Sequence, residues 1–326
     1  MWQREVAASP EVHSPSDSEI LAAWSLFPLS GGCVSRLALP DVTLACVDTR
    51  APQTALAAIE QCIARIEFAR VVLFTDAAAQ DTLPAHIDGV PISIGSVDEY
   101  SAFMLRGLAT HITTPFVLVV QWDGYVLDAS AWDPAFLEYD YIGAPFRSGP
   151  QGWLVGNGGF SLRSAKLLAA MQNPAITISN PEDTCICHEN RDRLERDFGI
   201  RFAPSDVASR FSYERVAPTG PTFGFHGLFN FHHIMTSDQL RDCLHALPDE
   251  LVCGVDGRDL CRILIADGQL DLAALIIAKR KRLGLFHNRT LRLRFALQQA
   301  RLQRRMTEPA ATDVIDAHRS RSTPTD

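Results

Sequence analysis

The stretch that decides the fold is residues 115–128, which read PFVLVVQWDGYVLD. Its apolar part, residues 116–120, lacks period-2 alternation and is short for a helix, so it predicts a strand buried on both faces. Asp123 and Gly124 follow this strand. Open α/β sheets bind ligands at the carboxyl ends of their strands, so a carboxylate here can hold a divalent cation while glycine permits close backbone approach. The alternative is an Asp-Gly turn that only ends the strand.

Strand and helix patterns alternate in the sequence before this stretch. Residues 42–47, 70–75 and 90–94 are rich in apolar and β-branched side chains and predict strands. Residues 51–68 and 97–112 carry apolar side chains at helical spacing. This order predicts an α/β fold with one wound, mostly parallel sheet that is flanked by helices and has right-handed crossovers.

Polar or aromatic residues follow three of the predicted strands, and they are Asp48, Thr49, Asp76, Gln121 and Trp122. Because strand C-termini share one edge of such a sheet, we expect these side chains near the crevice, where the base and ribose of a nucleotide donor need hydrogen-bonding groups. Each is also an ordinary strand-exit or helix-cap residue. No G-x-G-x-x-G follows the first strand, which disfavours a dinucleotide enzyme.

Four further motifs follow: YDYIGAP at 139–145, VGNGGFSLR at 155–163, PED at 181–183 and FGFHG at 223–227. In order and spacing, together with QWDG, the series resembles the DUF5672 family of GT-A-type, glycosyltransferase-like proteins, over residues 41–230. The resemblance implies a GT-A-like (Rossmann-like) domain that uses a nucleotide-sugar donor. The acceptor it implies is a hydroxyl, which we expect to belong to a glycan or a lipid-linked glycan.

The glycine-rich motif and the acidic pair can each be interpreted in two ways. Asn157, Gly158 and Gly159 would let the backbone approach the donor closely, although a loop that only makes a turn has the same composition. Glu182 and Asp183 lie in the first turn of a helix predicted for residues 181–198, where carboxylates favour the helix dipole. They also suit an inverting transferase, which needs a base and an orienting group for the acceptor. Carried over by resemblance, Asp183 is the base candidate and Glu182 its catalytic partner.

His226 lies between glycine and aromatic residues in FGFHG. An imidazole can complete a metal site that a carboxylate begins, and the resemblance implies that His226 and Asp123 hold Mn²⁺ or Mg²⁺. A structural histidine is the alternative. The sequence departs from the usual Asp-x-Asp, because Gln121-Trp122-Asp123 lacks the first carboxylate. Three other functions therefore stay open: a retaining transferase, a nucleotidyltransferase, and a non-catalytic nucleotide- or carbohydrate-binding module.

The composition is that of an ordinary globular protein with a sizeable core: 326 residues, 47% hydrophobic and 21% charged. A net charge of −8 argues against broad nucleic-acid binding, so we expect no nucleic-acid partner. Several of the eight cysteines lie within apolar runs, as buried free thiols of a reducing compartment do. No apolar run approaches the ~20 residues of a membrane span. We expect a cytoplasmic protein, peripheral to the inner face of the membrane.

The composition changes after residue 236. Residues 237–306 predict a C-terminal extension of short helices. The predicted organisation is a tail with one short helix at 1–35, the GT-A-like domain at 36–236, this extension, and a disordered tail at 307–326.

The extension carries ten basic residues: Lys279, Arg280, Lys281, Arg282, Arg289, Arg292, Arg294, Arg301, Arg304 and Arg305. Helical spacing places an apolar stripe beside them, made of Leu291, Phe295, Leu302 and Met306. We expect this stripe to pack on the core domain and the arginines to face outward, where residues 279–305 would contact an anionic membrane weakly. A solvated helical face is the alternative.

Overall fold

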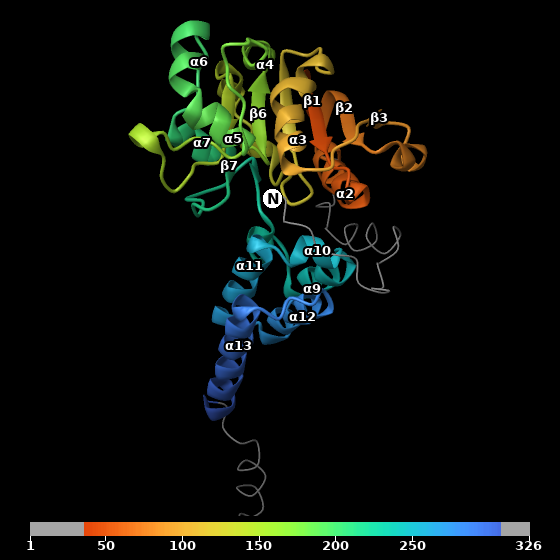
Figure 1. Cartoon of the computed structure of the whole chain (residues 1–326), viewed down its shortest axis with the longest axis vertical. Coiled ribbons are helices and arrows are strands. Elements are labelled where there is room, and N and C mark those ends of the chain that lie inside the picture. Colours follow the sequence, from red (N-terminus) through yellow and green to blue (C-terminus); the bar gives the residue numbers. More distant parts are fainter. Residues whose placement is uncertain (1–35, 308–326) are drawn as a thin grey trace, which may run out of the picture.

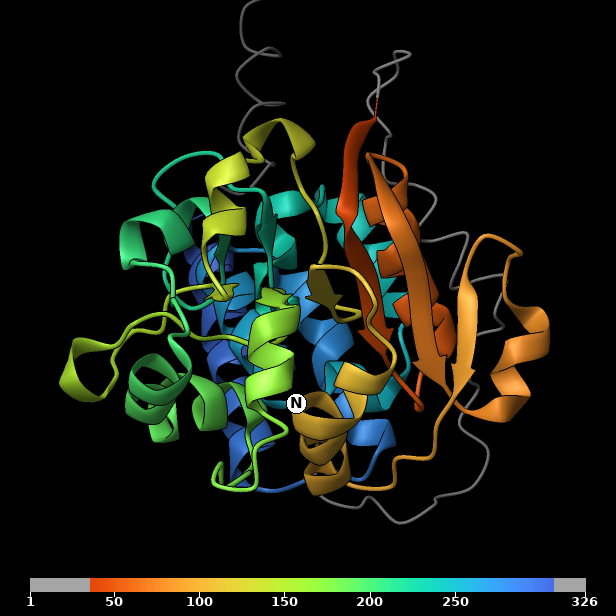
Figure 2. The same ribbon diagram turned by 90° about the horizontal axis from the view of Figure 1, so that it is seen from above.

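The structure is a computed structural model that describes residues 36–307. At its centre lies a six-stranded sheet in the order β3-β2-β1-β4-β6-β5 (Figure 1; Figure 2). Its strands are β1 (Leu37–Val47), β2 (Ile66–Thr75), β3 (Asp88–Pro91), β4 (Phe116–Val120), β5 (Tyr141–Gly143) and β6 (Ser161–Ser164). Neighbours among β1 to β4 pair in parallel, and β6 runs antiparallel to β4 and β5. The predicted wound, mostly parallel sheet is confirmed.

β4 is buried on both faces, as residues 116–120 predict. Leu118 and Val120 pack in one hydrophobic core, together with side chains of α2 (Pro52–Ile63). Val117 and Val119 pack in a second core, on the other face of the sheet because successive side chains of a strand alternate. Each such buried side chain contributes about 1.5–3 kcal/mol to folding. A strand between two cores has no solvent face, which explains its unbroken apolar pattern.

Two predicted boundaries near the first strand are wrong. The helix predicted for residues 51–68 ends at Ile63, because the chain from Ile66 onward pairs with β1. β1 itself begins earlier than predicted, at Leu37, and its register shifts around Pro40. Proline cannot donate a ladder hydrogen bond, so it obscures the strand pattern in the sequence while a register shift accommodates it in the sheet.

The single helix predicted for residues 181–198 is also wrong. α5 (Glu182–Thr184) leads into a π-helical turn at Cys185–Glu189, and α6 (Arg191–Phe198) follows. Asn190 lies between them, and its side-chain amide donates to two backbone carbonyl oxygens. The bond to the Cys185 carbonyl competes for an acceptor that a continuous helix would use, and the bond to the Thr177 carbonyl ties this turn to a neighbouring loop.

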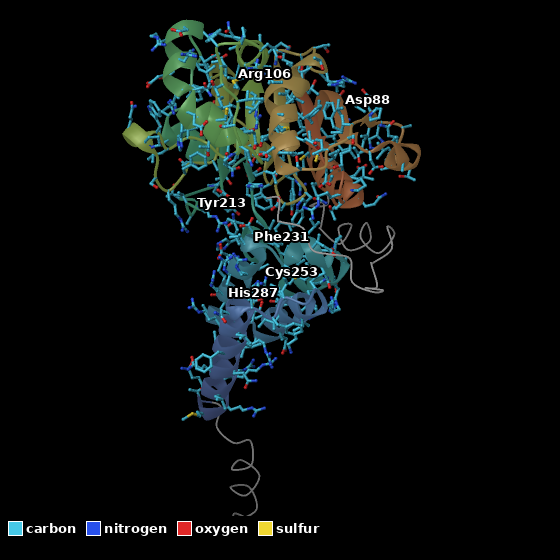
Figure 3. The ribbon with its side chains drawn as sticks, viewed as in Figure 1. Asp88, Arg106, Tyr213, Phe231, Cys253 and His287 are labelled. Atoms are coloured by element: carbon cyan, nitrogen blue, oxygen red, sulfur yellow. The ribbon has the colours of Figure 1, made fainter. Side chains whose placement is uncertain are left out.

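The remaining elements of the α/β part are short. They are α3 (Val97–Ala102), which continues through a π-helical and a 3₁₀ turn to Thr110, and α4 (Ala165–Ala170), α7 (Ser205–Phe211), β7 (Ser212–Tyr213), β8 (Gly224–Phe225) and α8 (Phe231–Ile234). β7 and β8 form a small parallel pair. Tyr213 and Phe231 both pack on Phe225, and Figure 3 shows them near the junction with the C-terminal helices.

The C-terminal helices extend below the sheet (Figure 1). They are α9 (Ser237–Ala246), α10 (Asp249–Val252), α11 (Val255–Ala266), α12 (Leu270–Arg282) and α13 (Asn288–Thr307). They agree with the short helices predicted for residues 237–306. No helix that the structure describes is both long enough and apolar enough to cross a membrane. The predicted N-terminal tail, its short helix and the predicted C-terminal tail beyond Thr307 lie outside the described residues.

Part of the basic series supports the fold and does not face outward, which corrects the expectation for its first members. Lys279 is buried and its Nζ donates to Asp249 Oδ1 at 2.8 Å. Arg280 is fully buried and its Nε donates to Thr290 Oγ1 at 3.0 Å. Arg282, whose side chain is 47% exposed, adds a bidentate pair with Asp249. Buried charges require partners, and only the fold reveals that Lys279 and Arg280 are buried and have them.

The predicted packing of the apolar stripe on α13 is wrong as well. The side chains of Leu291, Phe295, Leu302 and Met306 are exposed to 47%, 64%, 57% and 86%. A different face of α13, with Leu293 and Leu297, is buried in the part of the helix that packs on α11 and α12. The sequence offers α13 two apolar faces, and the neighbouring helices select one of them.

Candidate functional site

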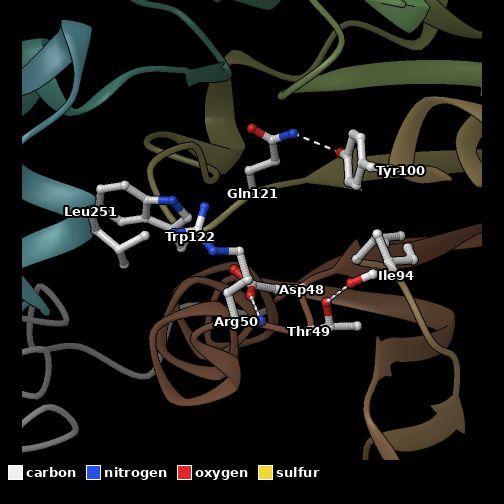
Figure 4. A pocket seen from close by; sticks show the side chains of 9 residues that line it. Asp48, Thr49, Arg50, Ile94, Tyr100, Gln121, Trp122 and Leu251 are labelled. Atoms are coloured by element: carbon white, nitrogen blue, oxygen red, sulfur yellow. Dashed lines mark hydrogen bonds between the residues drawn. The ribbon is translucent and has the colours of Figure 1, made fainter. Parts of the chain in front are cut away.

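A groove lies where the carboxyl ends of β1 and β4 meet the C-terminal helices. It consists of two adjoining cavities of ≈ 80 Å³ and ≈ 40 Å³, which share Arg50, Trp122 and Leu251. Figure 4 shows the larger one, to which Asp48, Thr49, Tyr100 and Gln121 contribute. The smaller one includes Asp123, Glu250 and Asp256. The groove is therefore at the edge of the sheet that the strand order predicts.

Asp123 and His226 meet beside the smaller cavity. Asp123 is buried in the turn after β4, and its Oδ1 lies 3.4 Å from Nε2 of His226. Its Oδ2 accepts a hydrogen bond from the Leu228 amide at 3.2 Å, and its backbone carbonyl accepts one from the Gly227 amide at 2.8 Å. These hydrogen bonds connect the FGFHG segment to the end of β4 and keep the imidazole beside the carboxylate.

The two side chains form an ion pair in the metal-free protein. Burial acts to lower the pKa of His226, but the carboxylates of Asp123 and Glu214 outweigh burial and raise this pKa to about 10. Burial acts to raise the pKa of Asp123, but the charge and hydrogen bond of His226 outweigh it and lower that pKa. A bound metal ion needs the neutral imidazole, so it would take the place of a proton here.

Gln121 occupies the position of the absent carboxylate and is held from two sides. Its amide nitrogen donates to the Tyr100 hydroxyl at 2.7 Å (Figure 4). Its Oε1 lies 3.0 Å from Nε2 of His226. Trp122 packs edge-on against Phe231 with ring centroids 6.3 Å apart, and it lines both cavities. All three residues of the QWD segment therefore line the groove.

The glycine-rich loop approaches the same pair. Asn157 has a left-handed backbone, with φ 44, and its side-chain amide nitrogen lies 3.1 Å from Nδ1 of His226. A Cβ atom on Gly159 would lie under 3.0 Å from three ring atoms of His226, and one on Gly158 equally close to Glu182 Oε1. Only glycine permits such approaches. These glycines are therefore required by close contact with predicted site residues, and not only by a turn.

The two acids of PED differ in environment. Glu182 is buried, with Oε1 at 3.7 Å from Nη2 of the fully buried Arg163. Burial and the neighbouring Asp183 raise the pKa of Glu182. Asp183 is half-buried, and its Oδ2 and Oδ1 accept hydrogen bonds from the amides of Gly158 at 3.3 Å and Thr184 at 2.7 Å. Asp183 is the more exposed acid of the pair.

The strand-exit residues divide into two groups. Asp48 and Thr49 line the larger cavity, where Asp48 Oδ1 also accepts hydrogen bonds from the amides that lead into α2 and Thr49 Oγ1 donates to the Ile94 carbonyl at 3.2 Å. Asp76 caps the 3₁₀ helix Ala77–Thr82 instead, and it is not among the described residues that line either cavity. For Asp76 the geometry favours the cap role.

Sequence reasoning missed the contribution of the C-terminal helices to this site. α10 and the start of α11 bring Leu251, Gly254, Val255 and Asp256 to the smaller cavity. Arg215 joins the two parts, because its guanidinium pairs with Asp256 and, at 2.6 Å, with Asp259. Burial and the nearby Asp123 raise the pKa of Asp256. No local motif marks Asp256, since it approaches Asp123 only once these helices have packed.

Asp123 and His226 fit a divalent cation as a pair. Two adjacent ligands of an octahedral ion, with bonds of about 2.1 Å, lie about 3 Å apart, and Oδ1 and Nε2 are 3.4 Å apart. Carboxylate and imidazole are both ligands of Mn²⁺-type ions. Within residues 36–307, no group of three or more His, Cys, Asp or Glu side chains is arranged to hold a metal ion. A cation at this pair would need further ligands of another kind.

Comparisons with solved structures return glycosyltransferases at low similarity. A galactosyltransferase, LgtC, in complex with donor and acceptor sugar analogues, is 14% identical with a TM-score of 0.37, and the match covers 56% of this chain and 86% of that one. The mannosyltransferase PcManGT from Pyrobaculum calidifontis, in complex with GDP-Man and Mn²⁺, is 14% identical with a TM-score of 0.35, covering 87% and 92%. For S. aureus TarS 1-349 in complex with UDP-GlcNAc the values are 10%, 0.30, 82% and 92%. At TM-scores this low, the similarity supports no conclusion about the activity of this chain.

No curated protein matches the chain. Residues 90–226 match the family described as protein of unknown function (DUF5672), in agreement with the resemblance of the motifs. The matched segment contains β4, the glycine-rich loop, the acidic pair and, at its end, His226. The segment that matches the DUF5672 model supplies most of the predicted site residues.

Proposed function

We propose that this protein is a glycosyltransferase that moves a sugar from a nucleotide-sugar donor to a hydroxyl of a glycan or lipid-linked glycan. The observation that carries the proposal is a continuous chain of contacts at one edge of the sheet. Asp123 pairs with His226, His226 contacts Asn157, and the neighbouring Gly158 donates to Asp183. These contacts support the proposal, because they would bring a cation site, a donor loop and a candidate base next to one another.

The donor would lie along the groove. Asp48 and Thr49 offer hydrogen-bonding groups for the nucleoside in the larger cavity, and Trp122 offers a ring for the base, a contact worth about 1–3 kcal/mol. The diphosphate would lie in the smaller cavity beside Asp123. Asp123 and His226 would hold Mn²⁺ or Mg²⁺, which when bound neutralises charge on the departing diphosphate.

Asp183 would act as the general base of an inverting reaction. Its carboxylate takes the proton of the acceptor hydroxyl as the acceptor oxygen bonds to the anomeric carbon. The bond from that carbon to the donor diphosphate breaks, and its electron pair leaves with the nucleoside diphosphate. The amides of Gly158 and Thr184 fix the carboxylate. Glu182, buried against Arg163, would orient this segment.

Two isosteric variants test the assignment of the base. Asp183→Asn should bind the donor as the wild type does and should lose about 10²-fold or more in transfer, the usual scale of general-base assistance. Transfer is measured with a labelled donor, and donor affinity by titration calorimetry. If Glu182→Gln is the inactive variant, the roles are reversed. If both variants bind donor and neither they nor the wild type transfers sugar, the protein is a binding module.

We also propose that α13 docks on an anionic membrane, which would keep a cytoplasmic protein next to a lipid-linked acceptor. α13 carries six arginines and no acidic residue, although the whole chain has a net charge of −8. Its stripe of Leu291, Phe295, Leu302 and Met306 is exposed, with basic side chains beside it. Two copies of this helix would repel each other. An anionic bilayer can bury the apolar stripe at its interface and attract the arginines through its headgroups.

Vesicle co-sedimentation tests this docking. The wild type should bind anionic vesicles at low salt and should dissociate from them near 1 M salt. It should not bind neutral vesicles. Phe295→Glu should abolish binding, whereas Ile178→Glu, at a side chain that is 37% exposed on the α/β part, should not. Equal binding by Phe295→Glu, or equal binding to neutral vesicles, would refute the membrane role and leave the transferase proposal untouched.

A further inference from the structure

We infer that Gln121 supplies a third ligand of the cation site through its Oε1 atom, and that Tyr100 orients the amide for this purpose. The inference rests on the proposed function, because the ion would serve the nucleotide-sugar donor. It explains how a chain with Gln-Trp-Asp in place of Asp-x-Asp can still form a cation site.

Side-chain oxygen atoms of Gln121 and Asp123 both lie near one ring nitrogen of His226. His226 Nε2 lies 3.0 Å from Gln121 Oε1 and 3.4 Å from Asp123 Oδ1. Both distances are close to the about 3 Å between adjacent ligands of an octahedral ion. Amide carbonyl oxygens are accepted ligands of such ions, as they are in many calcium and magnesium sites. The site would therefore offer two oxygen ligands and one nitrogen ligand, and diphosphate and water would supply the remaining ones.

Tyr100 supports the amide in the orientation that the structure shows. The Gln121 amide nitrogen donates to the Tyr100 hydroxyl at 2.7 Å, and the amide oxygen is the atom that faces His226. Tyr100 is buried in the second core with Val117 and Val119 of β4, which keeps the hydroxyl fixed relative to the strand that carries the site. Burial also raises the pKa of Tyr100 well above its usual value, so the hydroxyl stays neutral. Tyr100 is thus a positioning residue.

A neutral ligand changes the charge of the loaded site. With Asp123 as the one carboxylate among the three ligands, a divalent ion would keep a net charge of +1, whereas two carboxylates would cancel it. Such a site binds the ion weakly by itself and more tightly when an anionic diphosphate joins it. By thermodynamic linkage, the ion and the nucleoside diphosphate should strengthen each other's binding, typically by 5–150-fold, or roughly 1–3 kcal/mol.

Electron paramagnetic resonance of free Mn²⁺ measures this directly and needs no activity. The wild type should bind Mn²⁺ weakly alone and on the order of 10-fold or more tightly with UDP or GDP. Gln121→Glu keeps the shape and adds a carboxylate, so it should raise Mn²⁺ affinity without nucleotide by about 10-fold. Gln121→Met removes the ligand and should lower affinity with nucleotide. Tyr100→Phe should lower it by about 10-fold, as losses of orienting partners do.

Gln298→Glu on the exposed part of α13 controls for added charge and should match the wild type. If Gln121 only caps the imidazole, Gln121→Glu would strengthen the pair with the protonated ring, and Mn²⁺ affinity would stay the same or fall; that result would overturn the inference. If Asp123→Asn loses Mn²⁺ binding while both Gln121 variants keep it, the cation site stands without Gln121. If the wild type binds no Mn²⁺ even with UDP or GDP, the cation part of the proposed function fails as well.

Discussion

Gly159→Ala should disable the cation site by moving one imidazole. A Cβ atom at this position would lie under 3.0 Å from three ring atoms of His226. To restore the ordinary contact distance of 3.4–4 Å, the ring would have to retreat by about 1 Å. That displacement exceeds what a ligand shell with distances fixed to within a few tenths of an ångström tolerates.

The cost to folding should be moderate, because the ring is buried but has a partly open groove beside it. Overpacking a well-packed site typically costs 1–3 kcal/mol, so we expect Gly159→Ala to lower the free energy of unfolding by about that amount. The contacts of His226 with Gln121 at 3.0 Å and with Asp123 at 3.4 Å should both be lost or lengthened. Mn²⁺ affinity in the presence of UDP or GDP should therefore fall by at least about 10-fold.

The assay combines urea denaturation with Mn²⁺ titration by paramagnetic resonance. Gly220→Ala is the matched control, because a Cβ there would meet no atom within 4 Å. It should change neither stability nor Mn²⁺ binding. The reasoning is refuted if Gly159→Ala is folded, loses no stability and binds Mn²⁺ with nucleotide as tightly as the wild type does.

Three further predictions concern stability. Asp249→Ala leaves the buried Lys279 without its carboxylate and should cost about 3–5 kcal/mol in urea denaturation, whereas Asp238→Ala, which breaks an exposed pair, should cost less than about 1 kcal/mol; similar losses for both would contradict the structural role of Lys279. The pKa of His226, raised to about 10 by the carboxylates that outweigh burial, lies above its unfolded value near 6.5, so its stabilisation is fully present below pH 6.5 and is lost as pH rises through 10. The melting temperature of the metal-free wild type should accordingly fall over this range more than that of His226→Gln, and parallel curves would contradict the ion pair. Arg163→Met leaves a buried carboxylate unpaired and should cost about 3–5 kcal/mol by the same measurement, with a loss under 1 kcal/mol showing that the pair contributes little.

The centre of the fold could be predicted from the sequence because its signal is local. Residues 116–120 are apolar throughout, and a strand between two cores requires that pattern. The order of the patterns before it then predicts a wound, parallel sheet. The predicted element boundaries were wrong where pairing with a distant strand determines the boundary, as at Ile66. They were also wrong where a side chain such as Asn190 interrupts a helix.

The candidate site could be predicted in part for the same reason. The motifs that carry Asp123, Asn157, Asp183 and His226 can each be recognised locally, and the structure brings them together. The contribution of α10 and α11 could not be predicted, because those helices reach the groove only by tertiary packing. The prediction of which face of α13 is buried was wrong for the same reason. The sequence gives this helix two apolar faces, and only packing on α11 and α12 determines which one is covered.

The most direct test of the central claim is donor binding by titration calorimetry, with a panel of nucleotide sugars, for the wild type and for Asp123→Asn. The proposed function predicts that at least one nucleotide sugar binds the wild type in the presence of Mn²⁺. EDTA should weaken that binding, and Asp123→Asn, which keeps the size and removes the charge, should weaken it by about 10-fold or more. Binding of no nucleotide sugar with or without Mn²⁺, or equally tight binding by Asp123→Asn, would contradict a donor site at this edge of the sheet.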